Sequence, residues 1–333
     1  MSPAAHGGAL PVLVAPDKFK GTLRAEEAVT ALARGLRASG REVVELPVAD
    51  GGEGTMEALL AVRGGELRDA RVEDPLGREV EASFALLGND GTIAVVEAAQ
   101  ASGLWRLHED ELDPWGASTR GTGELIAAAV AAGAREVIVA CGGTATVDGG
   151  AGALAALDEA DVEPRLVVAC DARSPWEEAA RVFGPQKGAD ERMVARLDRR
   201  LDELADAAPA DPRGVPMTGC GGGLSGGLWT HRGARLESGA ALVLDELGFD
   251  TRMRAAAFVV TGEGRLDEQT LAGKAVGEVA TRCRQAGVAC HAVCGEAALD
   301  PFGERILDLA SVHQAGTEAE LERAGRELGS ELH

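Results

Sequence analysis

Residues 11–50, which read PVLVAPDKFKGTLRAEEAVTALARGLRASGREVVELPVAD, decide the fold class of this chain. The apolar run at 11–17 predicts a buried strand, the apolar spacing at 24–40 an amphipathic helix, and 41–50 a second strand. Such short connections are typical of a parallel sheet with a right-handed crossover. Both strands end in an aspartate near glycines, at the sheet edge where open parallel sheets collect ligands.

A chain of 333 residues is long for one domain. Its middle alternates polar and apolar residues over 65–99, which predicts an antiparallel meander, before strands and helices alternate again. We therefore predict an α/β protein of two domains. A doubly wound parallel-sheet domain is formed by both ends of the chain, residues 10–62 and 246–333, and a mixed α/β domain, residues 63–245, is inserted. We expect the active site in a cleft between them.

The net charge is −21, from 33 basic and 54 acidic residues. This charge repels nucleic acid and anionic membranes, and an aromatic content of 3% offers few platforms for stacking bases. No run approaches the ~20 apolar residues of a membrane span, and the first residues lack the basic region of a signal peptide. We expect a cytoplasmic protein that binds neither nucleic acid nor membranes.

The six cysteines are dispersed in apolar or Gly-rich settings. The segment CHAVC at 290–294 allows a metal site as an alternative, although strand alternation puts Cys290 and Cys294 on the face opposite His291. Buried thiols in a reducing cytoplasm are the preferred interpretation.

Two familiar phosphate motifs are absent. The Walker A pattern fails because Ala275 follows Lys274 and Glu268 stands where the leading glycine should be. A GxGxxG spacing begins at Gly221, but no strand precedes it, so a Gly-rich helix entry or a close backbone contact is the preferred interpretation over a dinucleotide site.

Lysine is confined to four positions, and every other basic residue is an arginine. All four lie in short Gly-bearing loops, which favours a phosphate-binding role over a solvated surface charge; chance in a small sample is the alternative. They are Lys18, Lys20, Lys187 and Lys274.

Seven carboxylates stand at predicted strand ends or in glycine loops. Such groups bind Mg²⁺ together with substrate phosphates, or accept a proton; for any single one, a helix cap or a turn is the alternative. They are Asp17, Asp50, Glu53, Asp148, Asp171, Glu263 and Asp267. Three loops, at 118–124, 141–152 and 219–227, offer backbone N–H groups to an anion. The pattern favours a nucleotide–magnesium site over a nicotinamide site.

Seven motifs resemble the glycerate kinase family, the bacterial type that phosphorylates D-glycerate. In chain order they are APDKFKGTL, ADGGEGT, DPLGR, STRGTGELI, GGTATVDGG, VFGPQKGA and TGEGRLDEQTLAGK. The resemblance implies a two-domain α/β kinase fold, ATP and Mg²⁺ as co-substrate and cofactor, and 2-phosphoglycerate as product, with 3-phosphoglycerate the other candidate. D-glycerate and ATP are the expected small-molecule partners. No residue pattern decides the oligomeric state, although a homodimer would be unsurprising.

The resemblance and the loop patterns described above together suggest site residues for this chain, and their individual roles are our inference. The predicted catalytic residues are Lys20, Asp50, Asp171, Lys187, Arg265 and Asp267, of which Asp171 and Asp267 are the predicted metal ligands. The predicted nucleotide-binding residues are Gly142, Gly143, Thr144, Asp148, Gly149, Glu263, Thr270 and Lys274. The predicted substrate-binding residues are Asp17, Lys18, Glu53, Thr119 and Arg120.

Two segments depart from the family pattern: the stretch after Gly152 is short, and SPWEEAAR at 174–181 replaces a Gly-containing loop near Asp171. The second departure leaves open a kinase of another small hydroxy acid. A binding relative without turnover is the alternative from another class.

Overall fold

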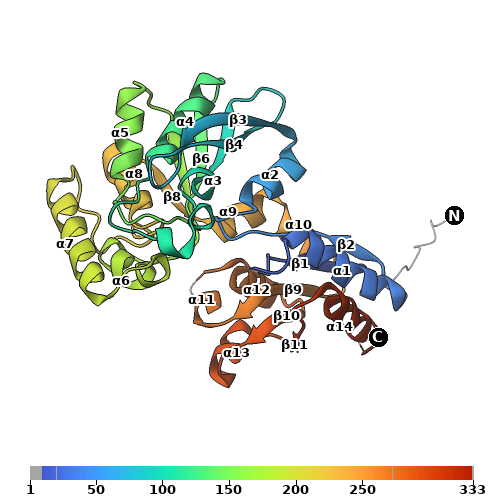
Figure 1. Ribbon diagram of the computed structural model, residues 1–333. Coiled ribbons are helices and arrows are strands. Elements are labelled where there is room, and N and C mark those ends of the chain that lie inside the picture. Colours follow the sequence, from blue (N-terminus) through green and yellow to red (C-terminus); the bar gives the residue numbers. More distant parts are fainter. Residues whose placement is uncertain (1–9, 20, 272, 332–333) are drawn as a thin grey trace. The chain divides into compact units, whose positions relative to one another are not determined.

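The computed structural model of the chain describes residues 10–19, 21–271 and 273–331. It confirms the predicted α/β class, with two sheets and their surrounding helices (Figure 1). The chain divides into two units: unit 1 runs to Ala49 and resumes at Leu244, and unit 2 spans Asp50–Val243. Residues 50–62, which the sequence had placed with the terminal domain, group with unit 2 because helix α2 (Thr55–Arg63) packs on two of its strands.

Unit 1 holds a wholly parallel sheet of five strands. Their spatial order is β11 (Ser311–Gln314), β10 (Cys290–Ala297), β9 (Val259–Leu266), β1 (Val12–Pro16) and β2 (Val43–Glu45). The chain continues along β1 beyond β2, since the N–H groups of Leu46 and Val48 donate to Val14 and Pro16 at 2.9 and 3.0 Å. Pro47 between them lacks an N–H, which an edge strand tolerates.

Two helices of unit 1, α1 (Ala25–Ala38) and α14 (Glu318–Glu331), lie side by side (Figure 1). A Cβ on Gly35 would lie 2.0 Å from the Glu322 carbonyl oxygen, and one on Gly325 would lie 2.4 Å from that of Leu32. The absence of these Cβ atoms permits the close approach. The other helices of this unit are α10 (Phe249–Arg254), α11 (Glu268–Leu271), α12 (Ala275–Ala286) and α13 (Pro301–Leu307).

Unit 2 holds a mixed sheet. The strands run β3 (Gly65–Glu73), β4 (Glu79–Leu87), β5 (Ile93–Glu97), β6 (Glu136–Ala140), β7 (Arg165–Cys170) and β8 (Arg235–Ser238). The first three form the predicted antiparallel meander, and the last four pair in parallel. Its helices include α3 (Ala98–Ser102), α4 (Arg120–Ala131), α5 (Ala151–Glu159), α6 (Ala179–Phe183) and α7 (Glu191–Ala207), and α9 (Gly239–Glu246) leads into unit 1.

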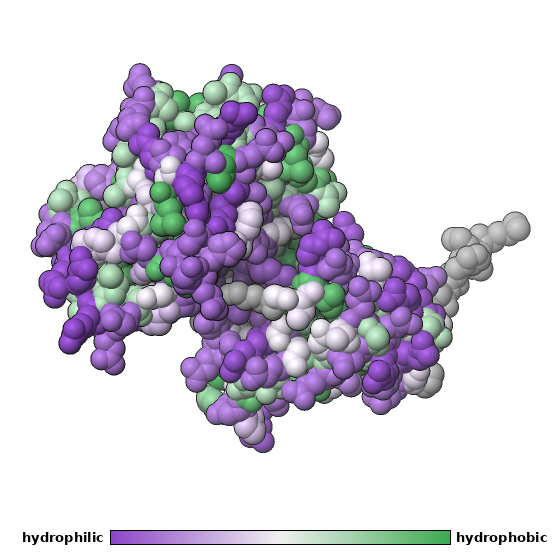
Figure 2. Space-filling view, in the orientation of Figure 1, coloured by the Kyte–Doolittle hydropathy of each residue, from purple (hydrophilic) through white to green (hydrophobic). Residues whose placement is uncertain are grey.

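The Gly-rich stretch of unit 2 forms both a helix entry and a close backbone contact, the two structures that its sequence favoured over a dinucleotide site. Helix α8 (Leu224–Arg232) begins after Gly223, and a Cβ on Gly226 would lie 2.5 Å from the Trp176 ring. Strand β8 directly after this helix was not predicted. Among the described residues, no helix is long and apolar enough to cross a membrane. The face drawn in Figure 2 is mostly hydrophilic, with scattered apolar residues.

Candidate active site

The carboxyl ends of β6 and β7 in unit 2 gather two predicted loops and one predicted aspartate. The Gly142 N–H donates to the Gly51 carbonyl oxygen at 3.3 Å. A Cβ on Gly142 would lie 2.8 Å from the Gly52 Cα and 2.9 Å from an Asp171 carboxylate oxygen. The two glycine loops therefore touch through their backbones beside Asp171, and no larger residue fits between them.

Asp171 directly follows β7 and stands near two other acidic groups. Burial, followed by the charges of Cys220 and Asp50, raises the pKa of the Asp171 carboxyl to about 8. Asp50 is 9% exposed, and its carboxylate accepts a hydrogen bond from the Gly52 N–H at 3.3 Å. Two repelling carboxylates at a strand-end loop form a set of hard oxygen donors.

Lys187 supplies a buried cation to the same unit. It lies in a short turn, Pro185–Lys187, and is 3% exposed. Its ammonium donates to the Thr144 hydroxyl at 3.2 Å and to the Thr146 carbonyl oxygen at 2.7 Å. Burial lowers the pKa of Lys187 to about 8, against the opposing charges of Asp171 and Asp148. The lysine is thus aimed at the loop between β6 and α5.

Asp148 and Thr119, predicted as ligand-binding residues, bind each other. The Thr119 hydroxyl and N–H donate to the Asp148 carboxylate at 2.8 and 2.9 Å. The same carboxylate accepts from the N–H groups of Gly150 and Gly152 at 3.1 and 3.2 Å. Asp148 is 1% exposed, so the carboxylate caps the start of α5, which was the alternative interpretation of this aspartate.

Arg120 is held in a network of three carboxylates. Its guanidinium lies 3.4 Å from Glu73, 3.0 Å from Glu124 and 2.6 Å from Glu159. The hydrogen bond with Glu159 raises the pKa of Arg120, which keeps the charge permanent. The structure thus gives Arg120 local partners, and its predicted contact with substrate stays a prediction.

The loop at 50–54 has an anchor that the sequence analysis missed. Glu97, at the end of β5 and 3% exposed, accepts hydrogen bonds at 2.9 Å from the N–H groups of Gly54 and Met56. It thereby caps α2 and fixes the loop that carries Glu53. The Glu53 carboxylate lies near Gly143, at 3.1 Å from where a Cβ would stand. The signal in the sequence that could have revealed Glu97 is its position as an acid directly after the apolar run IAVV.

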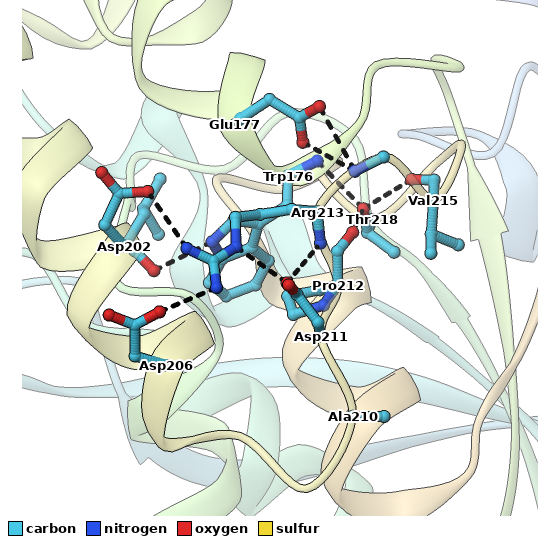
Figure 3. Close-up of polar contacts among 12 residues, drawn as sticks. Trp176, Glu177, Asp202, Asp206, Ala210, Asp211, Pro212, Arg213, Val215 and Thr218 are labelled. Carbon is cyan, nitrogen blue, oxygen red and sulfur yellow. Dashed lines mark hydrogen bonds and ion pairs between the residues drawn. The ribbon is translucent and has the colours of Figure 1, made fainter.

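The departing segment at 174–181 is hydrogen-bonded to the segment that precedes the Gly-rich stretch (Figure 3). The Trp176 N–H donates to the Thr218 hydroxyl at 2.9 Å, and Glu177 accepts from the Gly214 N–H at 3.0 Å. Arg213, next to Gly214, forms ion pairs with Asp206 and Asp211 at 2.7 and 2.8 Å, which stabilise this contact. The departing loop is thus well ordered by contacts of its own.

The Trp176 ring packs closely against several glycines. A Cβ on Gly149 would lie 2.8 Å from this ring, and one on Gly223 would lie 3.1 Å from it. Gly149, predicted to contact nucleotide, therefore has a packing role. The indole N–H donates to the Leu201 carbonyl oxygen at 2.9 Å, which satisfies its polar atom.

Unit 1 gathers a second group of predicted residues at its own strand ends. Glu263 of β9 is 4% exposed and accepts a 2.5 Å hydrogen bond from the Thr270 hydroxyl. The Lys274 ammonium lies 3.7 Å from the other oxygen of Glu263. Asp17 lies next to this strand, since its N–H donates to the Gly262 carbonyl oxygen at 2.8 Å and its carboxylate accepts from the Lys18 N–H at 2.7 Å.

Arg265 and Asp267 are the more open members of this group. The Arg265 guanidinium is 58% exposed and lies 3.5 Å from Asp267 and 3.4 Å from Glu296. Asp267 also accepts a hydrogen bond from the Gln269 N–H at 2.9 Å. Lys20, predicted as catalytic, lies outside the described residues.

Comparisons with known proteins agree with the motifs. The model of the Glycerate kinase family matches residues 12–163 and 158–325. The chain is 38% identical to the Glycerate 2-kinase of Escherichia coli (strain K12) over 79% of each chain. It is also 38% identical to the Glycerate kinase of Bacillus subtilis (strain 168), over 87% of this chain and 86% of that relative. A crystal structure assigned as a glycerate kinase 2 from Salmonella typhimurium LT2 superposes with a TM-score of 0.80, at 31% identity and 98% coverage of both chains.

Proposed function

The chain belongs to the glycerate kinase family, and from this membership we propose that it is an ATP-dependent kinase of D-glycerate. In this reaction the γ-phosphoryl group of ATP passes in line to a hydroxyl of glycerate. The product is 2-phosphoglycerate, with 3-phosphoglycerate as the alternative. The name of the Escherichia coli relative, Glycerate 2-kinase, supports the first product.

The buried ammonium of Lys187 is the observation that carries this proposal. Its two hydrogen-bond partners are neutral oxygens, and burial lowers the pKa of Lys187 to about 8. A phosphoryl group beside this ammonium would stabilise the charged form. We assign to Lys187 the neutralisation of charge on the transferred group, because phosphoryl transfer depends mainly on positioning and electrostatics.

Asp171 and Asp50 fit a magnesium site by the chemistry of their donors. Repulsion from Asp50 contributes to the raised pKa of Asp171, and a divalent cation would relieve it. Asp171 would hold the ion, and Asp50 would orient the glycerate hydroxyl and accept its proton. Mg²⁺, when bound, supplies charge neutralisation to the phosphate oxygens.

We assign the unit 1 group to the nucleotide. Lys274 with Glu263 and Thr270 would bind ATP phosphates, and Arg265 would pair with an anionic group of either substrate. Lys20 and the second predicted metal ligand, Asp267, are assigned here as well.

A coupled assay for ADP release tests the proposal. ADP should form only when ATP, Mg²⁺ and D-glycerate are all present, and ³¹P NMR of the product should show a phosphate on C2. ADP release that ignores glycerate, or needs a different hydroxy acid, would contradict the assignment.

Asp171→Asn and Asp198→Asn form a matched pair for this assay. Asp198 lies on α7 and no proposed role involves it. The first variant should lose turnover, whereas the second should keep it. Equal activity of both would remove Asp171 from the mechanism.

A further inference from the structure

Three cysteines from separate segments meet next to Asp171. Cys141 follows β6, Cys170 ends β7, and Cys220 comes from the Gly-rich stretch before α8. Their sulfur atoms all lie within 4.8 Å of one another, and the side chains are at most 2% exposed. Among the described residues, this is the one group of three Cys, His or acidic side chains so arranged.

The supporting backbone fixes the three thiols. Cys141 directly follows β6 and Cys170 ends the neighbouring parallel strand β7, each one residue beyond the paired Ala140 and Ala169. Cys220 sits where the chain crosses Cys141 closely: a Cβ on Gly221 would lie 3.0 Å from the Cys141 carbonyl oxygen. The hydrogen bonds of the Thr218 hydroxyl with the Trp176 N–H and the Pro212 carbonyl oxygen stabilise this crossing (Figure 3).

We propose that Cys141, Cys170 and Cys220 form a site for one thiophilic metal ion of the Zn²⁺ class. A Zn–S bond of ~2.3 Å gives sulfur separations of roughly 3.8 Å in a tetrahedral site, so small side-chain shifts suffice. Thiolate sulfur selects such ions over Mg²⁺, which prefers oxygen. The site is thus chemically distinct from the neighbouring carboxylates.

The charge balance favours a divalent ion. Three thiols lose three protons on binding, so that one Zn²⁺ and three thiolates carry a net charge of −1. Negative charge on Cys141 and Cys220 would raise the pKa of the buried Lys187 ammonium, so this cation would offset part of the charge of the ionised thiols. Asp171 follows Cys170 directly, so a bound ion would perturb the carboxylate proposed to hold Mg²⁺.

Metal titration of the fully reduced, complete chain tests the site. Co²⁺ serves as the visible probe, because thiolate coordination gives charge-transfer absorption that oxygen ligands do not. One Co²⁺ per chain should bind with this absorption, and Zn²⁺ should displace it. Absence of the absorption after prolonged incubation would overturn the proposal.

Matched variants separate the site from other thiols. Cys220→Ala and, separately, Cys141→Ala should weaken binding by at least the roughly 10- to 100-fold that outer-sphere partners cost in metal sites. Cys290→Ala serves as the control, because it removes an equally buried thiol from unit 1 and should leave binding unchanged. Thermal melts verify that each variant is folded. Unchanged Co²⁺ absorption in both Cys220→Ala and Cys141→Ala would overturn the proposal, as would its loss in Cys290→Ala.

The effect on turnover rests on the proposed function. Zn²⁺ in the presence of excess Mg²⁺ should inhibit the wild-type kinase and leave folded Cys220→Ala far less affected. The binding measurements decide the metal site even if glycerate proves not to be the substrate, so the two proposals fail separately.

Discussion

The two units each combine carboxylates near the ends of parallel strands with a lysine from a turn or helix start, in different electrostatic states. In unit 2, Lys187 is 3% exposed and bonded to neutral oxygens, and within the described residues no carboxylate lies at ion-pair distance from its ammonium. In unit 1, Lys274 is 26% exposed and lies 3.7 Å from Glu263. The ammonium of unit 1 thus has a carboxylate at ion-pair distance, whereas that of unit 2 is hydrogen-bonded to neutral oxygens and feels Asp171 and Asp148 only at longer range.

This difference separates a reactive group from a binding group. A buried charge without a carboxylate at ion-pair distance interacts strongly with an anion that arrives beside it, because little solvent screens the pair. A charge already paired with a carboxylate gains less. We therefore expect the largest effects on turnover at Lys187 and smaller effects, mainly on nucleotide affinity, at Lys274.

Lys187→Met should have the largest effect. It removes the buried charge at similar volume, and kcat should fall by about 100- to 1000-fold, the cost of removing one preorganised donor. Steady-state kinetics with D-glycerate measure it, with circular dichroism to verify the fold. A folded variant with near-normal kcat would break the comparison.

The pH dependence of metal binding should come next. The pKa of Asp171 is raised to about 8, so protons compete with Mg²⁺ below that pH. Affinity should fall by up to about tenfold per pH unit between pH 8 and pH 6 and level off above pH 8. Mn²⁺ relaxation titrations measure the slope, and Asp171→Asn should bind weakly without it. Equal affinity at pH 6 and pH 8 would contradict the assignment.

Lys274→Met should have a smaller effect. The KM for ATP should rise roughly tenfold, from the ~1.5 kcal/mol of one charged hydrogen bond, while kcat changes less than in Lys187→Met. Lys274→Arg keeps the charge and should restore much of the affinity. If kcat falls as far as in Lys187→Met, the two lysines act alike.

Glu97→Gln should have the smallest effect, on stability rather than chemistry. The amide oxygen accepts more weakly than the carboxylate from the Gly54 and Met56 N–H groups, so unfolding should cost about 1 kcal/mol less. Urea denaturation measures it, with exposed Glu81→Gln as the control. Equal midpoints in both variants would show that this anchor is dispensable.

Local patterns predicted most of the fold. The βαβ unit at 11–50 and the meander after residue 64 follow from apolar periodicity and turn residues. Strand β8 was not predicted because it is four residues long and only partly buried. The boundary near residue 50 escaped because tertiary packing of α2, rather than composition, decides it.

The candidate site was predictable in its loops but not in its contacts. That glycine loops at strand ends would carry the charged residues follows from general rules of parallel sheets. The mutual bonding of Asp148 and Thr119, and the local ion pairs of Arg120, depend on which helices become neighbours. The meeting of three cysteines likewise depends on strand order and a backbone crossing, which spacing along the chain does not reveal.

The pairing of β1 with β9 also constrains how the protein folds during its synthesis on the ribosome. The Thr261 hydroxyl donates to the Ala15 carbonyl oxygen across 246 positions of sequence. The first strand is therefore synthesised long before its partner and must wait while the whole of unit 2 emerges. Early folding of unit 2 would shorten the effective loop to be closed, turning a large insertion into a kinetic aid for its host.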